Sequence, residues 1–232
     1  MFNPFRNSNN HSIVHLFEVS NAERNELCAN IIESSAPRSD FYFLVFLSSI
    51  IVSWGVIINS IVLVIGGMLV TPLLSPILAI SLGAVILNIK VLIRSIRILL
   101  SSFFLAVLIA FVLGKSIEFN LLSSEIVTAM HPSISVFAIA AIAGVAASFT
   151  WAKKELNSNL PGVAITVTLI PPLTVVGLAL SQNEMPAFEN ALNVLLLNVA
   201  GIILGSLLIL TLMKFYKSEK KVMAEIKEEQ KM

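Results

Sequence analysis

The sequence predicts an all-α integral membrane protein of six transmembrane helices, arranged as two inverted three-helix repeats whose second and fifth spans are broken by prolines. Of its 232 residues, 56% are hydrophobic and only 12% are charged, about half the charged share of a soluble domain. The mean hydropathy is +0.90. So few charges cannot cover a soluble surface, which excludes a secreted or cytosolic enzyme.

The clearest feature is an uncharged run of 49 residues from Phe41 to Ile89. A spanning helix needs about 20 apolar residues, so this run holds two spans joined by a tight turn. We expect the turn at Trp54–Ser60, where Gly55 and Asn59 supply turn chemistry. Hydropathy places the six spans at residues 41–57, 60–87, 98–114, 132–152, 160–181 and 190–213.

The flanks of the membrane domain are more polar. Residues 1–40 are predicted to be a cytoplasmic segment without the pattern of a secretory signal. Its apolar stripe of Leu27, Ile31 and Ile32 is typical of a short amphipathic helix at the headgroups. Residues 41–213 form the six-span domain, with repeats at about 41–114 and 132–213. Residues 214–232 are predicted to be a charged cytoplasmic helix.

Charges in the loops predict the orientation. Basic residues gather at 88–97, at 152–159 and in the C-terminal tail, whereas acidic residues dominate 115–131 and 182–189. Cationic loops stay in the cytoplasm. We therefore expect a multi-pass protein of the cell inner (plasma) membrane, embedded in the lipid bilayer with both termini in the cytoplasm.

An internal repeat emerges when the second span is placed on the fifth at an offset of 100 residues. Pro72 then falls on Pro172, and Ser81 falls on Ser181. Four of the nine prolines lie in these two cores. Because each repeat has three spans, the second copy would be inverted, a recurring design of secondary transporters. The alternative is a chance alignment of apolar sequence.

The prolines define the candidate site. Each proline removes a backbone donor and frees carbonyls, which in lipid must be satisfied by protein, water or ligand. Hydroxyls lie at the same places, and Asn198 lies in the sixth span. The alternative is a pair of kinks capped by Ser and Thr. The candidate substrate-binding residues are Gly67, Thr71, Pro72, Ser75, Pro76, Thr166, Thr168, Pro171, Pro172, Thr174 and Asn198.

Three stretches carry a resemblance to a known family: IGGMLVTPLLSPILAISLG (65–83), GVAITVTLIPPLTVVGLAL (162–180) and LLLNVAGIIL (195–204). The sequence resembles the hydrophobic membrane-protein family catalogued as domain of unknown function 389. The resemblance covers about residues 38–213, with Gly67 where alanine is usual. It implies a membrane fold and a bacterial or archaeal source, and it supplies no biochemical activity.

Catalytic chemistry is not indicated by the sequence. It has no spaced acidic pair, no nucleophile with a base and no Gly-rich phosphate loop followed by lysine. One cysteine and three scattered histidines predict neither a metal centre nor another cofactor. We also expect no nucleic-acid partner. The spans lack the ionisable residue that proton-coupled carriers keep in the membrane.

These observations favour a permease or secondary transporter of a small solute or ion. Its midplane site would lie between the second and fifth spans, without intramembrane carboxylates, in a protein that forms a homo-oligomer. The alternatives are a membrane interaction or assembly protein, and an oligomeric channel. The GxxxG of Gly201 and Gly205 and the small-residue stripe of Ala140, Gly144 and Ser148 allow close helix approach, inside the bundle or between protomers.

Overall fold

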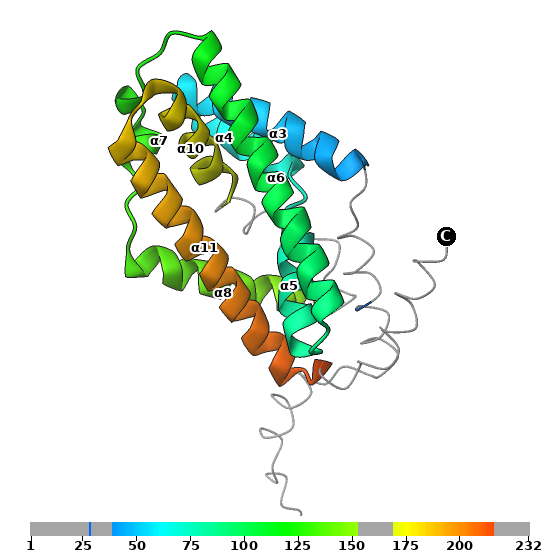
Figure 1. Ribbon diagram of the computed structural model, residues 1–232. Coiled ribbons are helices and arrows are strands. Elements are labelled where there is room, and N and C mark those ends of the chain that lie inside the picture. Colours follow the sequence, from blue (N-terminus) through cyan, green and yellow to red (C-terminus); the bar gives the residue numbers. More distant parts are fainter. Residues whose placement is uncertain (1–27, 29–38, 153–168, 216–232) are drawn as a thin grey trace, which may run out of the picture.

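The computed structural model describes Cys28 and residues 39–152 and 169–215, and all regular elements among them are helices (Figure 1). The predicted amphipathic helix before residue 38 and the tail after residue 215 lie outside the described residues. The elements are α3 (Ser39–Ile57), α4 (Ile61–Val70), α5 (Leu74–Val85), α6 (Ile89–Ser116), η1 (Leu121–Ser123), α7 (Glu125–Thr128), α8 (Ile134–Ala152), α10 (Ile170–Gln182) and α11 (Met185–Leu212).

Four of these helices are long and apolar enough to cross a membrane: α3, α6, α8 and α11. The pair α4 and α5 adds a fifth span if it is counted as one helix bent by 53°. The turn between α3 and α4 lies inside the predicted Trp54–Ser60 segment, with Asn59 at φ 54°. The predicted span at 160–181 is described only from residue 169 onward, where α10 provides 13 helical residues.

Helix α6 differs from its prediction. We expected a span at 98–114 after a cationic loop at 88–97, but the helix begins directly after Asn88. The Asn88 side chain accepts hydrogen bonds from the backbone N–H of Lys90 at 3.1 Å and of Val91 at 3.2 Å, so it caps the helix. The three basic residues of the expected loop therefore lie on the first three turns of α6. Hydropathy located the apolar middle of the helix and missed its polar start.

Helix α11 likewise begins at Met185 rather than at residue 190. Asn183 ends α10 in the left-handed conformation, with φ 58°. Pro186 follows in the first turn of α11, a position where its fixed φ suits a helix. The expected acidic loop at 182–189 is thus a two-residue turn, and Glu189 lies on the helix.

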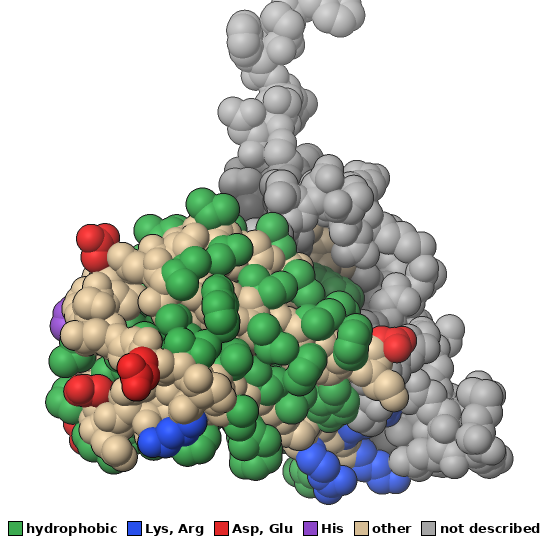
Figure 2. Space-filling view, turned by 90° about the horizontal axis from the view of Figure 1, so that it is seen from above, with side chains coloured by type: hydrophobic (Ala, Val, Ile, Leu, Met, Phe, Trp, Pro, Cys, Tyr) green, Lys and Arg blue, Asp and Glu red, His purple; other side chains and the backbone are tan. Residues whose placement is uncertain are grey.

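The two longest helices expose apolar stripes. On α6, the side chains of Leu100, Phe104, Leu108 and Val112 are between 44% and 70% exposed. On α11, those of Leu196, Leu204, Leu208 and Leu212 are between 51% and 57% exposed. In Figure 2, apolar side chains cover much of the described surface, and the charged ones lie at its margins. Such apolar faces suit lipid and not water, so this is a membrane-embedded helical protein.

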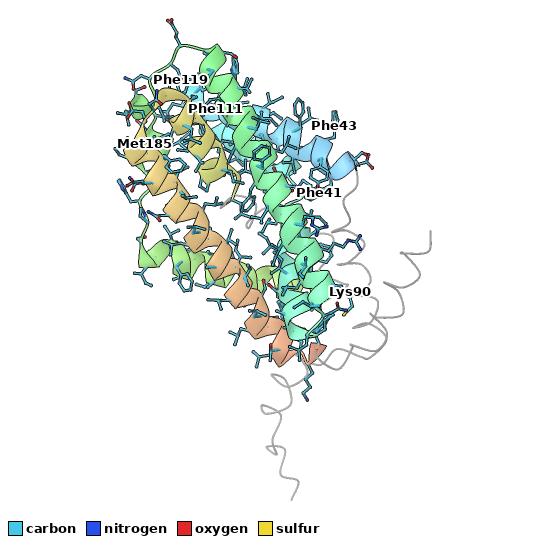
Figure 3. All side chains as sticks on the ribbon, in the orientation of Figure 1. Phe41, Phe43, Lys90, Phe111, Phe119 and Met185 are labelled. Atoms are coloured by element: carbon cyan, nitrogen blue, oxygen red, sulfur yellow. The ribbon has the colours of Figure 1, made fainter. Side chains whose placement is uncertain are left out.

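Helices α6 and α11 run in opposite directions along the molecule. In Figure 3, α6 starts at the lower end near Lys90 and passes Phe111 near the upper end, whereas α11 starts at the upper end at Met185. The short helix α10 lies at the upper end and α5 at the lower end (Figure 1). Helix α10 packs against α6, α11 and α3, while α5 packs against α6 and α11.

Candidate functional site

The second span breaks at residues 71–73, between α4 and α5. Thr71 is extended, with φ −81° and ψ 126°, the conformation that a residue preceding proline favours. Pro72 follows and has no N–H to donate. The Thr71 backbone N–H donates instead to the Met68 carbonyl at 3.3 Å. The helix is therefore interrupted at a point where the bundle carries hydroxyls and free carbonyls.

A serine on the neighbouring helix α3 closes this break. The Ser48 hydroxyl donates to the Gly67 carbonyl at 2.8 Å and also pairs with the Thr71 hydroxyl. The Thr71 Oγ1 lies 3.5 Å from the same carbonyl. Ser48 is fully buried and Thr71 is 6% exposed. Three oxygens from two helices thus meet in the membrane interior, which we call the break cluster (Ser48, Gly67 and Thr71).

The second proline site lies at the start of α10. Pro171 and Pro172 occupy the second and third positions of this helix, and both are buried. The Thr174 hydroxyl is fully buried and donates to the Pro171 carbonyl at 2.9 Å. A hydroxyl therefore donates to a backbone carbonyl beside the prolines here as well. Thr166 and Thr168, also predicted for the site, lie outside the described residues.

Prolines reduce the number of backbone donors at both half-helix starts. A helix that begins inside the membrane leaves its first N–H groups without intrahelical partners. Pro76 is the third residue of α5, and two prolines open α10, so these positions have no N–H. Their carbonyls remain. The prolines thus lower the number of unsatisfied donors, so fewer N–H groups remain there for protein, water or a ligand to satisfy.

The structure divides the predicted site residues among four helices. Helix α3, which carries Ser48, packs against both α4 and α10, so it joins the two proline sites. Gly67 and Thr71 belong to the break cluster, and Pro76 is buried on α5 with Pro72 and Ser75 half-buried beside it. The buried residues on α10 are Pro171, Pro172 and Thr174, and Asn198 is buried on α11.

Ser48 was missed by the sequence analysis. A serine in an apolar span commonly bonds to a carbonyl of its own helix, as Ser49 does with Val45 at 2.7 Å. Spacing along the first span does not distinguish the two serines. The sequence feature that could have pointed to Ser48 is the group of buried serines in that span, which also includes Ser53.

Among the residues that the structure describes, two buried hydroxyls have no hydrogen-bond partner, those of Ser53 on α3 and Ser148 on α8. They are 0% and 1% exposed. Both helices have 19 residues, and each serine is the fifteenth. A buried hydroxyl without a partner is costly, so these two positions mark places where water or a ligand group would be stabilised.

The small-residue motifs of the sequence pack together inside the bundle. A β-carbon at Gly201 would lie 2.8 Å from that of Ala140, and one at Gly205 would meet the Ala141 carbonyl. The Ser206 hydroxyl donates to the Gly144 carbonyl at 3.3 Å. Of the two possibilities left open by the sequence, these motifs therefore serve the contact between α8 and α11 in one chain.

Comparison with known proteins identifies a family for this chain but no activity. The chain is 27% identical over 166 residues to an uncharacterized protein of Methanocaldococcus jannaschii, which covers 72% of this chain and 52% of the relative. It thus spans about half the length of that curated relative. No solved structure matches the chain. A family described as "domain of unknown function (DUF389)" matches residues 68–204, more than half of the sequence, and the chain belongs to that family.

Proposed function

We propose that this protein is a permease or secondary transporter of a small solute or ion, with its site between the two proline-broken spans. Its six spans form two inverted three-helix repeats. It resides in the cell inner membrane as a homo-oligomer, with both termini in the cytoplasm. The proposal rests on the way the two halves of the described chain pack against each other.

A reciprocal pair of contacts is the observation that carries the proposal. On α10, Gly177 lies against the Val107 carbonyl of α6. On α5, Ser81 donates to the Ile203 carbonyl of α11 at 3.4 Å. Gly177 follows Ser81 by 96 residues, and Ile203 follows Val107 by 96 residues. Such an exchange of partners is expected of two copies related by a two-fold axis.

Helix boundaries support the same offset. Helix α11 begins at Met185, 96 residues after the start of α6 at Ile89, and both helices have 28 residues. Residues with left-handed φ precede both starts, at Leu87 and Asn183. An offset of 96 places Pro76, rather than Pro72, on Pro172. The antiparallel course of α6 and α11 in Figure 3 is the one that an inverted repeat requires.

The short helices are suited to a midplane site. At about 1.5 Å per residue, the 12 residues of α5 and the 13 of α10 cover about 18–20 Å of a hydrocarbon core about 30 Å thick. They lie at opposite ends of the molecule (Figure 1). Half-helices that enter from both sides and stop inside are typical of transporter binding sites.

Proton relay through side chains is not part of this proposal. In the described membrane-length helices, charged residues lie in the first turn of α3, the first three turns and the last turn of α6, and the second turn of α11. Proton-coupled carriers usually keep an ionisable group deeper in the membrane. Neutral oxygens are therefore the groups available to hold a substrate.

An assembly protein is the second candidate, because the hydroxyls at both breaks cap carbonyls. Ser48 bonds to Gly67, and Thr174 bonds to Pro171. Kinks satisfied in this way need no ligand and could simply shape the bundle for a partner. A channel is the third candidate, and it would need a continuous pore in the oligomer.

Reconstitution into liposomes with a panel of radiolabelled ions and metabolites tests the proposal. We expect substrate-dependent flux that Pro72→Ala abolishes, because a continuous helix would remove the break. Pro186→Ala is the matched control, since this exposed proline only opens α11. No flux from folded protein for any compound would refute transport. Retained partner binding in Pro72→Ala, without flux in the parent, would favour assembly.

A further inference from the structure

We propose that the break cluster binds a monovalent alkali cation, sodium or potassium. This inference rests on the proposed function and deepens it, because the cation would be the transported ion or the ion coupled to the substrate. Its ligands on the described chain would be the Gly67 carbonyl and the hydroxyl oxygens of Ser48 and Thr71.

The three oxygens are hydrogen-bonded to one another, so an ion would have to replace these hydrogen bonds and move the oxygens apart. The Ser48 oxygen lies 2.8 Å from the Gly67 carbonyl oxygen and is in contact with the Thr71 hydroxyl. All three belong to buried residues. The cluster lies at the C-terminal end of α4, where the helix dipole is negative and favours a cation.

The C-terminal end of α4 favours a cation over an anion, because a helix end leaves carbonyl acceptors without intrahelical partners. An anion needs N–H donors at helix starts, and Pro72 and Pro76 reduce the number of such donors beside the break. The carbonyl groups at the end of α4 remain as hydrogen-bond acceptors. In a medium without water, an excess of acceptors is balanced by hydroxyl protons or by a cation.

The ligand chemistry selects a single positive charge. Sites for divalent cations usually include carboxylates, and no group of three His, Cys, Asp or Glu residues lies together in the described part of the chain. Carbonyl and hydroxyl oxygens are neutral and match the weaker demand of an alkali ion, as in potassium-channel filters.

The hydroxyls can release the carbonyl when an ion arrives. Ser49, next to Ser48 on α3, donates to the carbonyl four residues earlier at 2.7 Å. If Ser48 turns its proton to its own helix in the same way, its lone pairs and the Gly67 carbonyl become free.

Thermal unfolding of the purified full-length chain tests the site. Tryptophan fluorescence is followed in sodium, potassium or choline chloride at equal ionic strength. Sodium or potassium at about 100 times its dissociation constant should raise the midpoint by about 5 °C. Ser48→Ala and Thr71→Val should lose this shift, whereas Thr71→Ser, which keeps the hydroxyl, should retain most of it.

Ser49→Ala is the matched control, because Ser49 is equally buried on the same helix but bonds within it. It should keep the shift. Equilibrium binding of radioactive sodium and rubidium gives a second readout that does not depend on stability. Equal midpoints in all three salts together with no binding, or a shift unaltered in Ser48→Ala and Thr71→Val, would overturn the inference. Cation-independent flux with no cation binding would also overturn it and would leave the permease standing.

Discussion

At the upper end of the molecule α10 lies against α6 almost backbone to backbone, whereas at the lower end α5 meets α11 through a side chain. A β-carbon at Gly177 would meet the Val107 carbonyl and would lie 2.6 Å from that of Ala110. Ser81, the counterpart of Gly177 at the proposed offset, instead carries a hydroxyl that reaches the Ile203 carbonyl at 3.4 Å. The two helix contacts that the proposed repeat makes equivalent thus differ in how closely the helices approach each other.

Two more contacts strengthen the upper end. Gly114 on α6 leaves room for Ser181 of α10, and the Gln182 amide donates to the Gly114 carbonyl at 3.0 Å. At the lower end, the 96-residue offset places Leu210, Val85 and Ile86 at these positions, and none of these side chains can donate a hydrogen bond. The difference indicates that α10 is held to α6 more firmly than α5 is held to α11, so any movement in the proposed transport cycle is expected first at α5.

The largest effect is expected from Gly177→Val. The added side chain would meet backbone atoms of α6, so α10 would have to move away. We expect the free energy of unfolding, from SDS titration in mixed micelles, to fall by about 3 kcal/mol. Gly66→Val is the control, because nothing lies within 4 Å of a β-carbon there. Equal losses in both variants would contradict close packing at Gly177.

Gly114→Ala should cost about 2 kcal/mol in the same titration. Its β-carbon would meet the Ser181 hydroxyl and lie 2.8 Å from the Ser181 β-carbon. Adding Ser181→Gly to the same chain should recover about 1 kcal/mol, because the space then opens. Additive effects of the two substitutions would show that these residues do not share one contact.

Gln182→Leu should cost about 1 kcal/mol, because the hydrogen bond to the Gly114 carbonyl is lost. Ser116→Ala provides the comparison, since its exposed hydroxyl bonds only to the Val112 carbonyl of its own helix. If Gln182→Leu is as mild as Ser116→Ala, the amide does not help to hold α10.

Ser81→Ala should have the smallest effect, about 0.5 kcal/mol. The hydroxyl is shared between the Ile203 carbonyl at 3.4 Å and the Ile77 carbonyl of its own helix at 3.3 Å, and both distances are long. A loss greater than that of Gln182→Leu would reverse the comparison and make α5 the more firmly held half-helix.

Some helix starts could be predicted from the sequence, and others could not. Helices α3 and α8 begin within two residues of their predicted spans, because charge and proline bound these apolar runs closely. The starts of α6 and α11 were placed nine and five residues too late, because caps rather than hydropathy define them. The proline alignment favoured an offset of 100, whereas the helix boundaries favour 96.

The same division holds for the candidate site. Thr71 and Thr174 could be chosen from sequence, since a hydroxyl beside a proline break has an obvious carbonyl to serve. Ser48 could not, because its partner Gly67 is 19 residues away on another helix. Ser53 and Ser148 lie on apolar helices beside other hydroxyls that are bonded, such as Ser49, and no local pattern distinguishes them.

The sequence by itself determined that this chain is embedded in lipid. It also determined which uncharged runs cross the membrane and at which positions the backbone lacks hydrogen-bond donors. These properties follow from composition and from the chemistry of proline, which act locally. Tertiary structure alone decided which hydroxyl meets which carbonyl, and that glycines bring α10 closer to α6 than α5 comes to α11. Those outcomes depend on distances between helices far apart in the chain, and no local pattern encodes them.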